Sequence, residues 1–151
     1  DGDIVIDVGA NIGYYTLLFA KKVGENGKVY AFEPDPVSFA ILEKNIKDNK
    51  FRNVEAFNIA LSDKRESLQL FISDENLGDH RLYDDYKIKR KKTTVKTNTL
   101  DLFFTDKEFE KNKVSLIKID TQGYEPYVIK GAQELIKNQK PTVFFEYWVY
   151  G

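Results

Sequence analysis

The sequence predicts an α/β fold with a doubly wound, mostly parallel sheet flanked by helices and an inserted β-hairpin. A short apolar run at residues 4–6 leads through a glycine turn into a helical segment at residues 14–20, as in a buried parallel strand followed by a crossover helix. A second apolar run at residues 28–32 ends in the acidic residue Glu33. Strand-like and helix-like segments then alternate along the chain, which is typical of a parallel sheet with helices on both faces.

The composition fits a single domain, which we expect to span residues 1–151. A chain of 151 residues is long enough to bury about two-thirds of the surface that it exposes when unfolded. Hydrophobic residues make up 42% and aromatic residues 14% of the chain, which excludes a disordered protein. The formal net charge of -1 gives no overall attraction to nucleic acid or anionic lipid, so we expect neither a nucleic-acid nor a membrane partner. The chain has no cysteine, which excludes disulfides and thiolate metal sites.

The glycine turn at residues 7–13 narrows the choice of cofactor. A turn that lets a ligand approach the backbone needs glycine or asparagine, which reach positive φ most easily. In a dinucleotide-binding turn the second glycine lets a pyrophosphate press against the backbone, but Asn11 occupies that position here and Tyr14 the third. The turn therefore favours S-adenosylmethionine, which has no phosphate, over NAD. We expect Gly9, Asn11 and Gly13 to contact this cofactor.

Two acidic residues complete the predicted cofactor site. Asp7 ends the first strand beside the turn, where its carboxylate could complement the ammonium group of the cofactor directly or through water, or could cap the amides of the turn. Glu33 ends the second strand, about 20 residues after the turn, which is the position of the acid that accepts hydrogen bonds from the ribose hydroxyls. The alternative for Glu33 is a solvated acid at a strand end, before the proline that follows it.

Three motifs together resemble the FkbM family of class I S-adenosylmethionine-dependent methyltransferases. Residues 7–13 resemble the first motif of that family, and residues 32–34 resemble its ribose-binding motif. Residues 116–125 are similar to the family signature Lys-Ile-Asp-Val-Glu-Gly-x-Glu. The chain departs from the commoner pattern at Thr121 and at Gln122, and Gln122 puts a neutral amide in place of a carboxylate.

The resemblance runs along nearly the whole chain and implies a Rossmann-like domain with S-adenosyl-L-methionine as its cofactor. It implies methyl transfer to a hydroxyl oxygen of a small-molecule or sugar acceptor, in the cytoplasm, where the cofactor is made. The full fold carries two more strands, so we expect a domain trimmed from a longer protein, with the C-terminal strands missing. An inactive or regulatory nucleoside-binding module, or an NAD-linked oxidoreductase, is the alternative function. The sequence leaves the oligomeric state open.

The hydrophobic periodicity predicts the remaining elements of the domain. We expect helices at residues 37–48 and 126–138. Residues 54–61 read as the third strand, whose end would place Asn58 and Ala60 beside the adenine of the cofactor. Asn58 could instead be a turn former.

Residues 67–72 and 93–100 alternate in strand fashion and predict the hairpin. The connection between them carries His80, the single histidine of the chain, and the unperturbed pKa of histidine, about 6.5, suits a general base near neutral pH. The alternative is an ordinary surface histidine. Arg81 could clamp a carboxylate or phosphate on the acceptor. The basic run at residues 87–92 indicates a solvated loop rather than a nucleic-acid site.

Two further acidic residues follow strands at the edge of the sheet where ligands bind. The strands at residues 114–119 and 142–145 deliver Asp120 and Glu146 to the carboxyl end of the sheet. We expect both carboxylates to be catalytic and to flank the transferring methyl, and Asp120 also to contact the cofactor. We expect no metal here, although hard oxygen ligands suit magnesium or calcium, so a divalent metal held between the two carboxylates is the alternative.

Several side chains near this edge are expected to bind the acceptor: Arg81, Gln122, Tyr124, Glu125, Tyr147 and Trp148. Glu125 could instead complement a helix dipole. The aromatic residues could instead be ordinary packing at the edge of the sheet.

Overall fold

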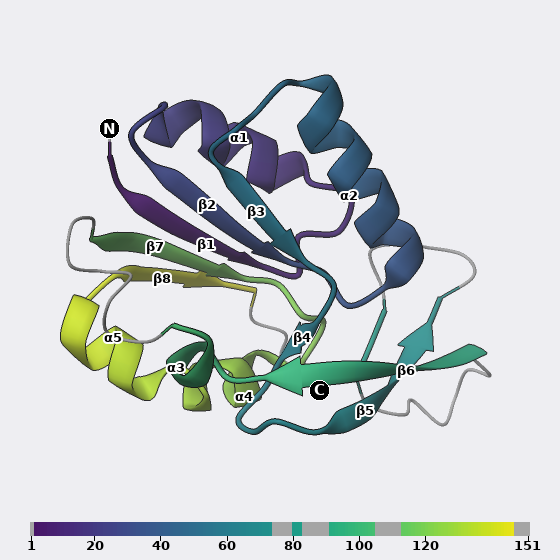
Figure 1. Cartoon of the computed structure of the whole chain (residues 1–151). Coiled ribbons are helices and arrows are strands. Elements are labelled where there is room, and N and C mark those ends of the chain that lie inside the picture. The colour runs from purple at the N-terminus through teal and green to yellow at the C-terminus, as the bar shows by residue number, and fades with distance from the viewer. Residues whose placement is uncertain (1, 74–79, 83–90, 105–112, 147–151) are drawn as a thin grey trace.

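The computed structural model describes residues 2–73, 80–82, 91–104 and 113–146 (Figure 1). Its centre is a five-stranded sheet in which every pairing is parallel, with the strand order β3-β2-β1-β7-β8. The strands are β1 (Ile4–Val8), β2 (Lys28–Phe32), β3 (Val54–Phe57), β7 (Val114–Ile119) and β8 (Thr142–Phe145). The predicted parallel sheet is confirmed, including the bounds of β7 and β8.

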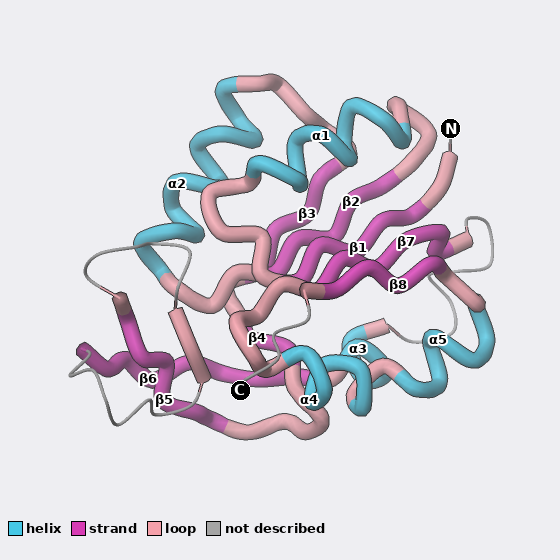
Figure 2. The backbone as a smooth tube through the Cα atoms, turned by 180° about the vertical axis from the view of Figure 1, so that it is seen from behind, coloured by secondary structure: helices cyan, strands magenta, loops and turns pink. Residues whose placement is uncertain are grey.

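Helices cover both faces of this sheet. One face carries α1 (Tyr14–Val23) and α2 (Pro36–Asp48), as Figure 1 shows above the sheet. The opposite face carries α3 (Leu100–Phe103), α4 (Glu125–Lys130) and α5 (Gln133–Gln139), which Figure 2 shows from behind. The arrangement is the predicted doubly wound α/β fold. Within the described part of the chain, no helix combines the length and the apolar character that crossing a membrane requires.

The alternation of side chains along β1 divides the core into two layers. Ile4, Ile6 and Val8 belong to the larger cluster, which includes residues of α4 and α5. Val5 faces the other way and packs with Ala20 of α1. Because all five residues of β1 are buried, a polar side chain on this strand must find its partner inside the protein.

The hairpin forms a second, smaller sheet. Its strands β5 (Ser67–Ile72) and β6 (Lys91–Asn98) are antiparallel, and the short β4 (Ala60–Leu61) pairs parallel with β6. The hairpin is confirmed, although β6 begins and ends two residues before the predicted strand. The small sheet lies beneath the carboxyl ends of β1 and β2 in Figure 1.

The predicted single strand at residues 54–61 is wrong. The chain leaves the central sheet after Phe57 and continues as β4 in the small sheet. The side-chain amide of Asn58 donates hydrogen bonds to the carbonyl oxygens of Glu33 (2.8 Å) and Pro34 (3.0 Å). These bonds fix the point where the strand breaks.

The predicted helix at residues 126–138 is also two helices, α4 and α5, separated at Gly131 and Ala132. A Cβ atom at Gly131 would overlap the backbone carbonyl of Ser62. The backbone of the small sheet therefore approaches the end of α4 too closely for a side chain. Helix α2 begins one residue before its predicted start, with Asp35 as its N-cap and Pro36 in its first turn.

Candidate functional site

The glycine turn lies at the carboxyl end of β1 and is held by close packing within the chain. Gly9 (φ 74°), Asn11 (φ 51°) and Gly13 (φ 97°) all adopt positive φ. A Cβ atom at Gly9 would overlap the carbonyl oxygen of Asp120, and one at Gly13 would lie 2.6 Å from Cδ1 of Leu42. The glycines therefore let β7 and α2 approach the turn, in addition to any role toward a ligand.

Glu33 is buried at the end of β2, with 5% of its surface exposed. Its Oε2 accepts a hydrogen bond from the backbone N–H of Asn11 (2.8 Å), and its Oε1 accepts one from that of Asp35 (2.9 Å). Burial raises the pKa of the Glu33 carboxyl to about 7, because the loss of water outweighs these two bonds. The alternative of a solvated acid is wrong.

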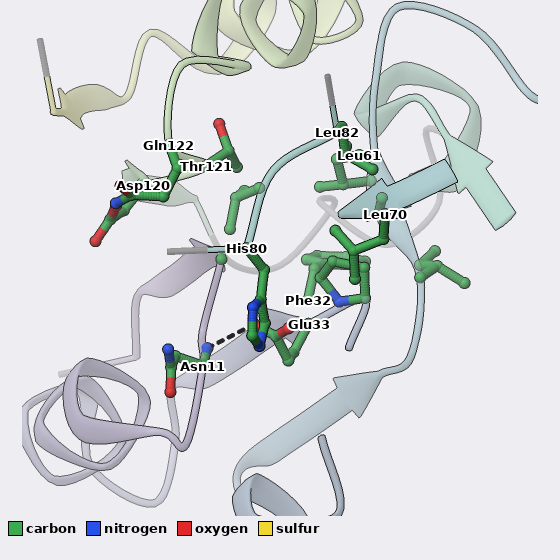
Figure 3. Close-up of a pocket in the computed structure, with 15 residues that line it drawn as sticks. Asn11, Phe32, Glu33, Leu61, Leu70, His80, Leu82, Asp120, Thr121 and Gln122 are labelled. Carbon is green, nitrogen blue, oxygen red and sulfur yellow. Dashed lines mark hydrogen bonds between the residues drawn. The ribbon is translucent and has the colours of Figure 1, made fainter. Parts of the chain in front are cut away.

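A pocket that is open to solvent joins the strand ends (Figure 3). Polar groups of the β1 turn, of the end of β2 and of the loop after β7 line it, together with apolar side chains of the small sheet. The lining residues are Val8, Gly9, Asn11, Phe32, Glu33, Pro34, Ile59, Ala60, Leu61, Leu70, His80, Leu82, Asp120, Thr121 and Gln122. Five residues predicted to bind cofactor, Gly9, Asn11, Glu33, Ala60 and Asp120, therefore share one pocket.

Asp7 lies inside the protein rather than at this pocket. Its side chain is fully buried, and its Oδ2 accepts a hydrogen bond from the hydroxyl of Thr16 in α1 (2.6 Å). Its Oδ1 lies 3.1 Å from Nζ of Lys118. The predicted direct contact with a cofactor ammonium group does not fit this position.

Lys118 is the main site residue that sequence reasoning missed. It is 2% exposed, and its Nζ donates a hydrogen bond to the carbonyl oxygen of Gly9 (2.8 Å). The same nitrogen lies 3.7 Å from Oδ2 of Asp120 and 5.4 Å from the ring centroid of Tyr15. The lysine therefore connects the buried Asp7 with the pocket residue Asp120.

Asp120 and Glu146 lie side by side, as predicted, because β7 and β8 are paired up to their last residues. The side-chain amide nitrogen of Gln122 donates one hydrogen bond to Oδ1 of Asp120 (3.0 Å) and one to Oε2 of Glu146 (3.1 Å). A continuous series of polar contacts thus runs from Thr16 through Asp7, Lys118, Asp120 and Gln122 to Glu146. It crosses the ends of three strands.

Glu125 organises the loop that carries Gln122. One oxygen, Oε1, accepts hydrogen bonds from the backbone N–H (2.8 Å) and the hydroxyl (3.0 Å) of Thr121 and from the N–H of Gly123 (3.1 Å). The residue is buried and does not line the pocket. Its predicted contact with the acceptor is replaced by this positioning of the loop.

His80 lines the pocket at the Glu33 side, away from Asp120 and Gln122 (Figure 3). Its side chain is 7% exposed, with Nε2 3.7 Å from Oδ2 of Asp35. The Nδ1 atom accepts a hydrogen bond from the backbone N–H of Ser73 (3.1 Å). The alternative of an ordinary surface histidine is wrong. Of the two predicted catalytic carboxylates, Asp120 lines the same pocket as His80 but at its other side, and Glu146 does not line it.

The other predicted residues either do not line the pocket or lie outside the described residues. Arg81 pairs with Phe71 through two backbone hydrogen bonds, and Tyr124 is 8% exposed, with its hydroxyl 3.2 Å from that of Ser62. Asn58 and Gly13 do not line the pocket either. Tyr147, Trp148 and most of the basic run at residues 87–92 lie outside the described residues.

Residues 7–148 match the family model described as the methyltransferase FkbM domain. The chain belongs to this family. The first motif and the signature around Asp120, from which the resemblance was inferred, both fall inside the matched region. The family implies S-adenosyl-L-methionine as the cofactor.

Relatives of the FkbM domain agree with this assignment. The chain is 24% identical to "Methyltransferase 1" of Beauveria bassiana over 89% of its own length and 60% of that protein. It is 27% identical to methyltransferase sdnD of Sordaria araneosa over 95% of its length and 66% of that protein. The chain therefore spans about two-thirds or less of these curated relatives.

Solved structures show the same fold. The methyltransferase FkbM from Methylobacillus flagellatus KT superposes with a TM-score of 0.65 at 17% identity, covering 95% of this chain and 32% of that one. A SAM-dependent methyltransferase from Aquifex aeolicus gives a TM-score of 0.50 at 19% identity, covering 100% of this chain and 62% of that one.

The residues of the pocket fit the cofactor that the FkbM family implies. A buried carboxylate, Glu33, faces the pocket at the end of β2, which suits a pair of ribose hydroxyls. The apolar surface formed by Ala60, Leu61, Leu70 and Leu82 suits a flat base. Among the described residues, no group of three or more His, Cys, Asp or Glu side chains is arranged to hold a metal ion.

Proposed function

We propose that this FkbM-family domain transfers the methyl group of S-adenosylmethionine to a hydroxyl oxygen of a small-molecule or sugar acceptor. The observation that carries the proposal is the shared pocket. It has a buried carboxylate, Glu33, at one end and Asp120 and Gln122 at the other, where Gln122 also donates a hydrogen bond to Glu146. One end suits a nucleoside and the other suits an acceptor hydroxyl.

At the nucleoside end, the two bonds from Asn11 and Asp35 fix the orientation of the Glu33 carboxylate. Its remaining lone pairs accept hydrogen bonds from the ribose hydroxyls. The apolar residues of the small sheet exclude water from the base. Asn58 holds the carbonyl groups of Glu33 and Pro34 and so supports this end from behind.

When bound, the cofactor supplies an electrophilic methyl group on a sulfonium, which leaves as a neutral thioether. The acceptor hydroxyl must lose its proton as its oxygen attacks, so a base and good alignment are needed. Asp120 lines this end of the pocket, and Gln122 connects it with the carboxylate of Glu146. We assign these two carboxylates the tasks of orienting the hydroxyl and of accepting its proton.

The base role expected for His80 remains a prediction. Because Nδ1 already accepts a hydrogen bond from Ser73, protonation there would remove that bond. The position of His80 beside Glu33 favours a contribution to the nucleoside end instead. Arg81 and Tyr124, expected to contact the acceptor, likewise remain predictions.

The assignment of an oxygen acceptor has one further support. The relative named 31-O-demethyl-FK506 methyltransferase FkbM, from Streptomyces tacrolimicus, is 54% identical over 44 residues, which is 29% of this chain and 16% of that protein. The name of that relative describes O-methylation. The two carboxylates favour a neutral hydroxyl-bearing acceptor over an anionic one, because like charges repel at short distance.

Isothermal titration calorimetry with S-adenosylhomocysteine, NAD and AMP tests the proposed cofactor. We expect S-adenosylhomocysteine to bind and NAD to show no measurable heat. Binding of NAD in its place would overturn the methyltransferase assignment. Transfer of a labelled methyl group to a panel of sugars and hydroxylated small molecules, with Asp120→Asn as the inactive control, then tests the acceptor class.

A further inference from the structure

We propose that Gln122 is a positioning residue whose side-chain amide takes the place of a bridging cation between Asp120 and Glu146. The inference rests on the proposed function only in its assignment of Asp120, Gln122 and Glu146 to the end of the pocket that binds the acceptor. The geometry itself is independent of that assignment.

The side-chain amide of Gln122 contacts both carboxylates. Its single amide nitrogen lies 3.0 Å from Oδ1 of Asp120 and 3.1 Å from Oε2 of Glu146. An amide nitrogen has two hydrogens to donate, and both are used here. Two carboxylates that would otherwise repel each other are therefore held around one shared donor group.

The conformation of the loop fixes the position of Gln122. Gln122 has φ 55° and Gly123 has φ 97°, and left-handed backbone is unfavourable for a residue with a side chain. Glu125 holds this conformation through three hydrogen bonds to one oxygen, two from Thr121 and one from Gly123. The turn aims the Gln122 side chain back across the ends of β7 and β8.

The two carboxylates differ in the charged groups around them. Asp120 has Lys118 on its other side, with Nζ 3.7 Å from Oδ2. For the carboxylate of Glu146, the hydrogen-bond donor in the described structure is the amide of Gln122. A carboxylate in place of this amide would bring three carboxylates together, and carboxylates are typical protein ligands of magnesium, manganese and calcium. The neutral amide thus allows two carboxylates to serve the acceptor without a divalent cation.

The substitution Gln122→Glu tests this directly, because it exchanges an amide for a carboxylate of the same shape. Manganese binding is measured by electron paramagnetic resonance, and thermal unfolding is followed with and without about 1 mM MnCl2. We expect the variant to bind one Mn²⁺ in roughly the millimolar range or tighter, as weak oxygen-ligand sites do. We also expect Mn²⁺ to raise its Tm, and the further change Glu146→Gln to abolish both effects.

Gln69→Glu is the matched control. Gln69 also donates through its side-chain amide, to Thr94, but it is an exposed residue of β5. The wild type and this control should show no Mn²⁺ binding and no change in Tm. If the wild type binds Mn²⁺ as tightly as Gln122→Glu, or if Gln122→Glu gains no affinity, the proposal is wrong.

A measurement on the wild type covers the case in which Gln122→Glu does not fold. In ¹⁵N–¹H spectra, both amide hydrogens of Gln122 should exchange with water more slowly than those of Gln69, which have one hydrogen-bond partner between them. Equal exchange rates would overturn the proposal. Calorimetry with S-adenosylhomocysteine on the same samples tests the proposed cofactor site separately, so failure of that site can be distinguished from failure of the proposal for Gln122.

Discussion

Lys118 and Asp7 form a buried ion pair beneath the glycine turn, with Nζ 3.1 Å from Oδ1 and side-chain exposures of 3% and 0%. The pair joins β7 to β1, where the two residues are register partners. Lys118 also donates to the carbonyl oxygen of Gly9. The position of the turn therefore depends on a charge contributed from more than one hundred residues further along the chain.

Removing the cation should cost much stability. In Lys118→Met, Asp7 keeps its bond to Thr16 but loses its counter-charge, and breaking one side of a buried pair typically costs about 3–5 kcal/mol. Urea unfolding measures the change in the free energy of unfolding. Lys44→Met is the control, because Lys44 pairs with Asp48 on the surface, where such pairs contribute at most about 1 kcal/mol. Equal losses in the two variants would contradict the buried pair.

The stability of the domain should carry an unusual pH dependence from Glu33. Its pKa rises from the ordinary value of 4.5 to about 7 on folding, so between these values the folded state holds a proton that the unfolded state has released. The contribution of Glu33 to stability therefore falls as the pH rises from about 4.5 to 7, by roughly 3 kcal/mol in total. Urea unfolding at pH 5 and pH 8 should show this loss in the wild type relative to Glu33→Gln. The same pH dependence in both proteins would show that Glu33 does not titrate as described.

Cofactor affinity should increase as the pH rises, whereas the stability contribution of Glu33 decreases. Ribose hydroxyls donate hydrogen bonds, so they prefer the ionised Glu33, and binding of S-adenosylhomocysteine should tighten by up to about tenfold per pH unit below the pKa. Calorimetry at pH 6 and pH 8 measures the change. Glu33→Gln should bind more weakly and lose most of this dependence. A dependence that persists unchanged in Glu33→Gln would show that Glu33 is not its source.

The turn should tolerate no side chain at Gly9. Alanine there must adopt φ 74° and would overlap the carbonyl group of Asp120, so Gly9→Ala should destabilise the domain by about 3 kcal/mol or more. Gly2 offers a matched control, because it has φ 87° but a Cβ atom placed there would meet no atom of the described residues within 4 Å, apart from its chain neighbours. Gly2→Ala should therefore show the backbone strain alone, about 1 kcal/mol. Thermal unfolding of both variants separates the overlap from the strain.

The local sequence pattern was sufficient to predict where the strands end and which acidic residues follow them. The apolar runs that precede Glu33, Asp120 and Glu146 determine which edge of the sheet these residues reach, so their shared location could be predicted. Lys118 could not be found this way. A single lysine in an apolar strand looks like an exposed position, and its partner, Asp7, is distant in sequence. The one available signal was that an acid and a base occupy matching places in two adjacent parallel strands.

Tertiary contacts decided the features that the sequence did not reveal. Asn58 ends β3 by bonding to the turn after β2, and Gly131, where α4 and α5 are separated, lies against the carbonyl of Ser62. Neither partner is close in sequence. The role of Glu125 could not be predicted either. A carboxylate at the start of a helix could interact with the helix dipole, bind the acceptor or accept hydrogen bonds from the preceding loop.

A crystal structure of the protein with S-adenosylhomocysteine tests the proposed site most directly. We predict that both ribose hydroxyls lie within hydrogen-bond distance of the Glu33 carboxylate and that the sulfur is directed toward Asp120 and Glu146. A nucleoside bound elsewhere, or bound with its sulfur directed away from these two carboxylates, would contradict this arrangement.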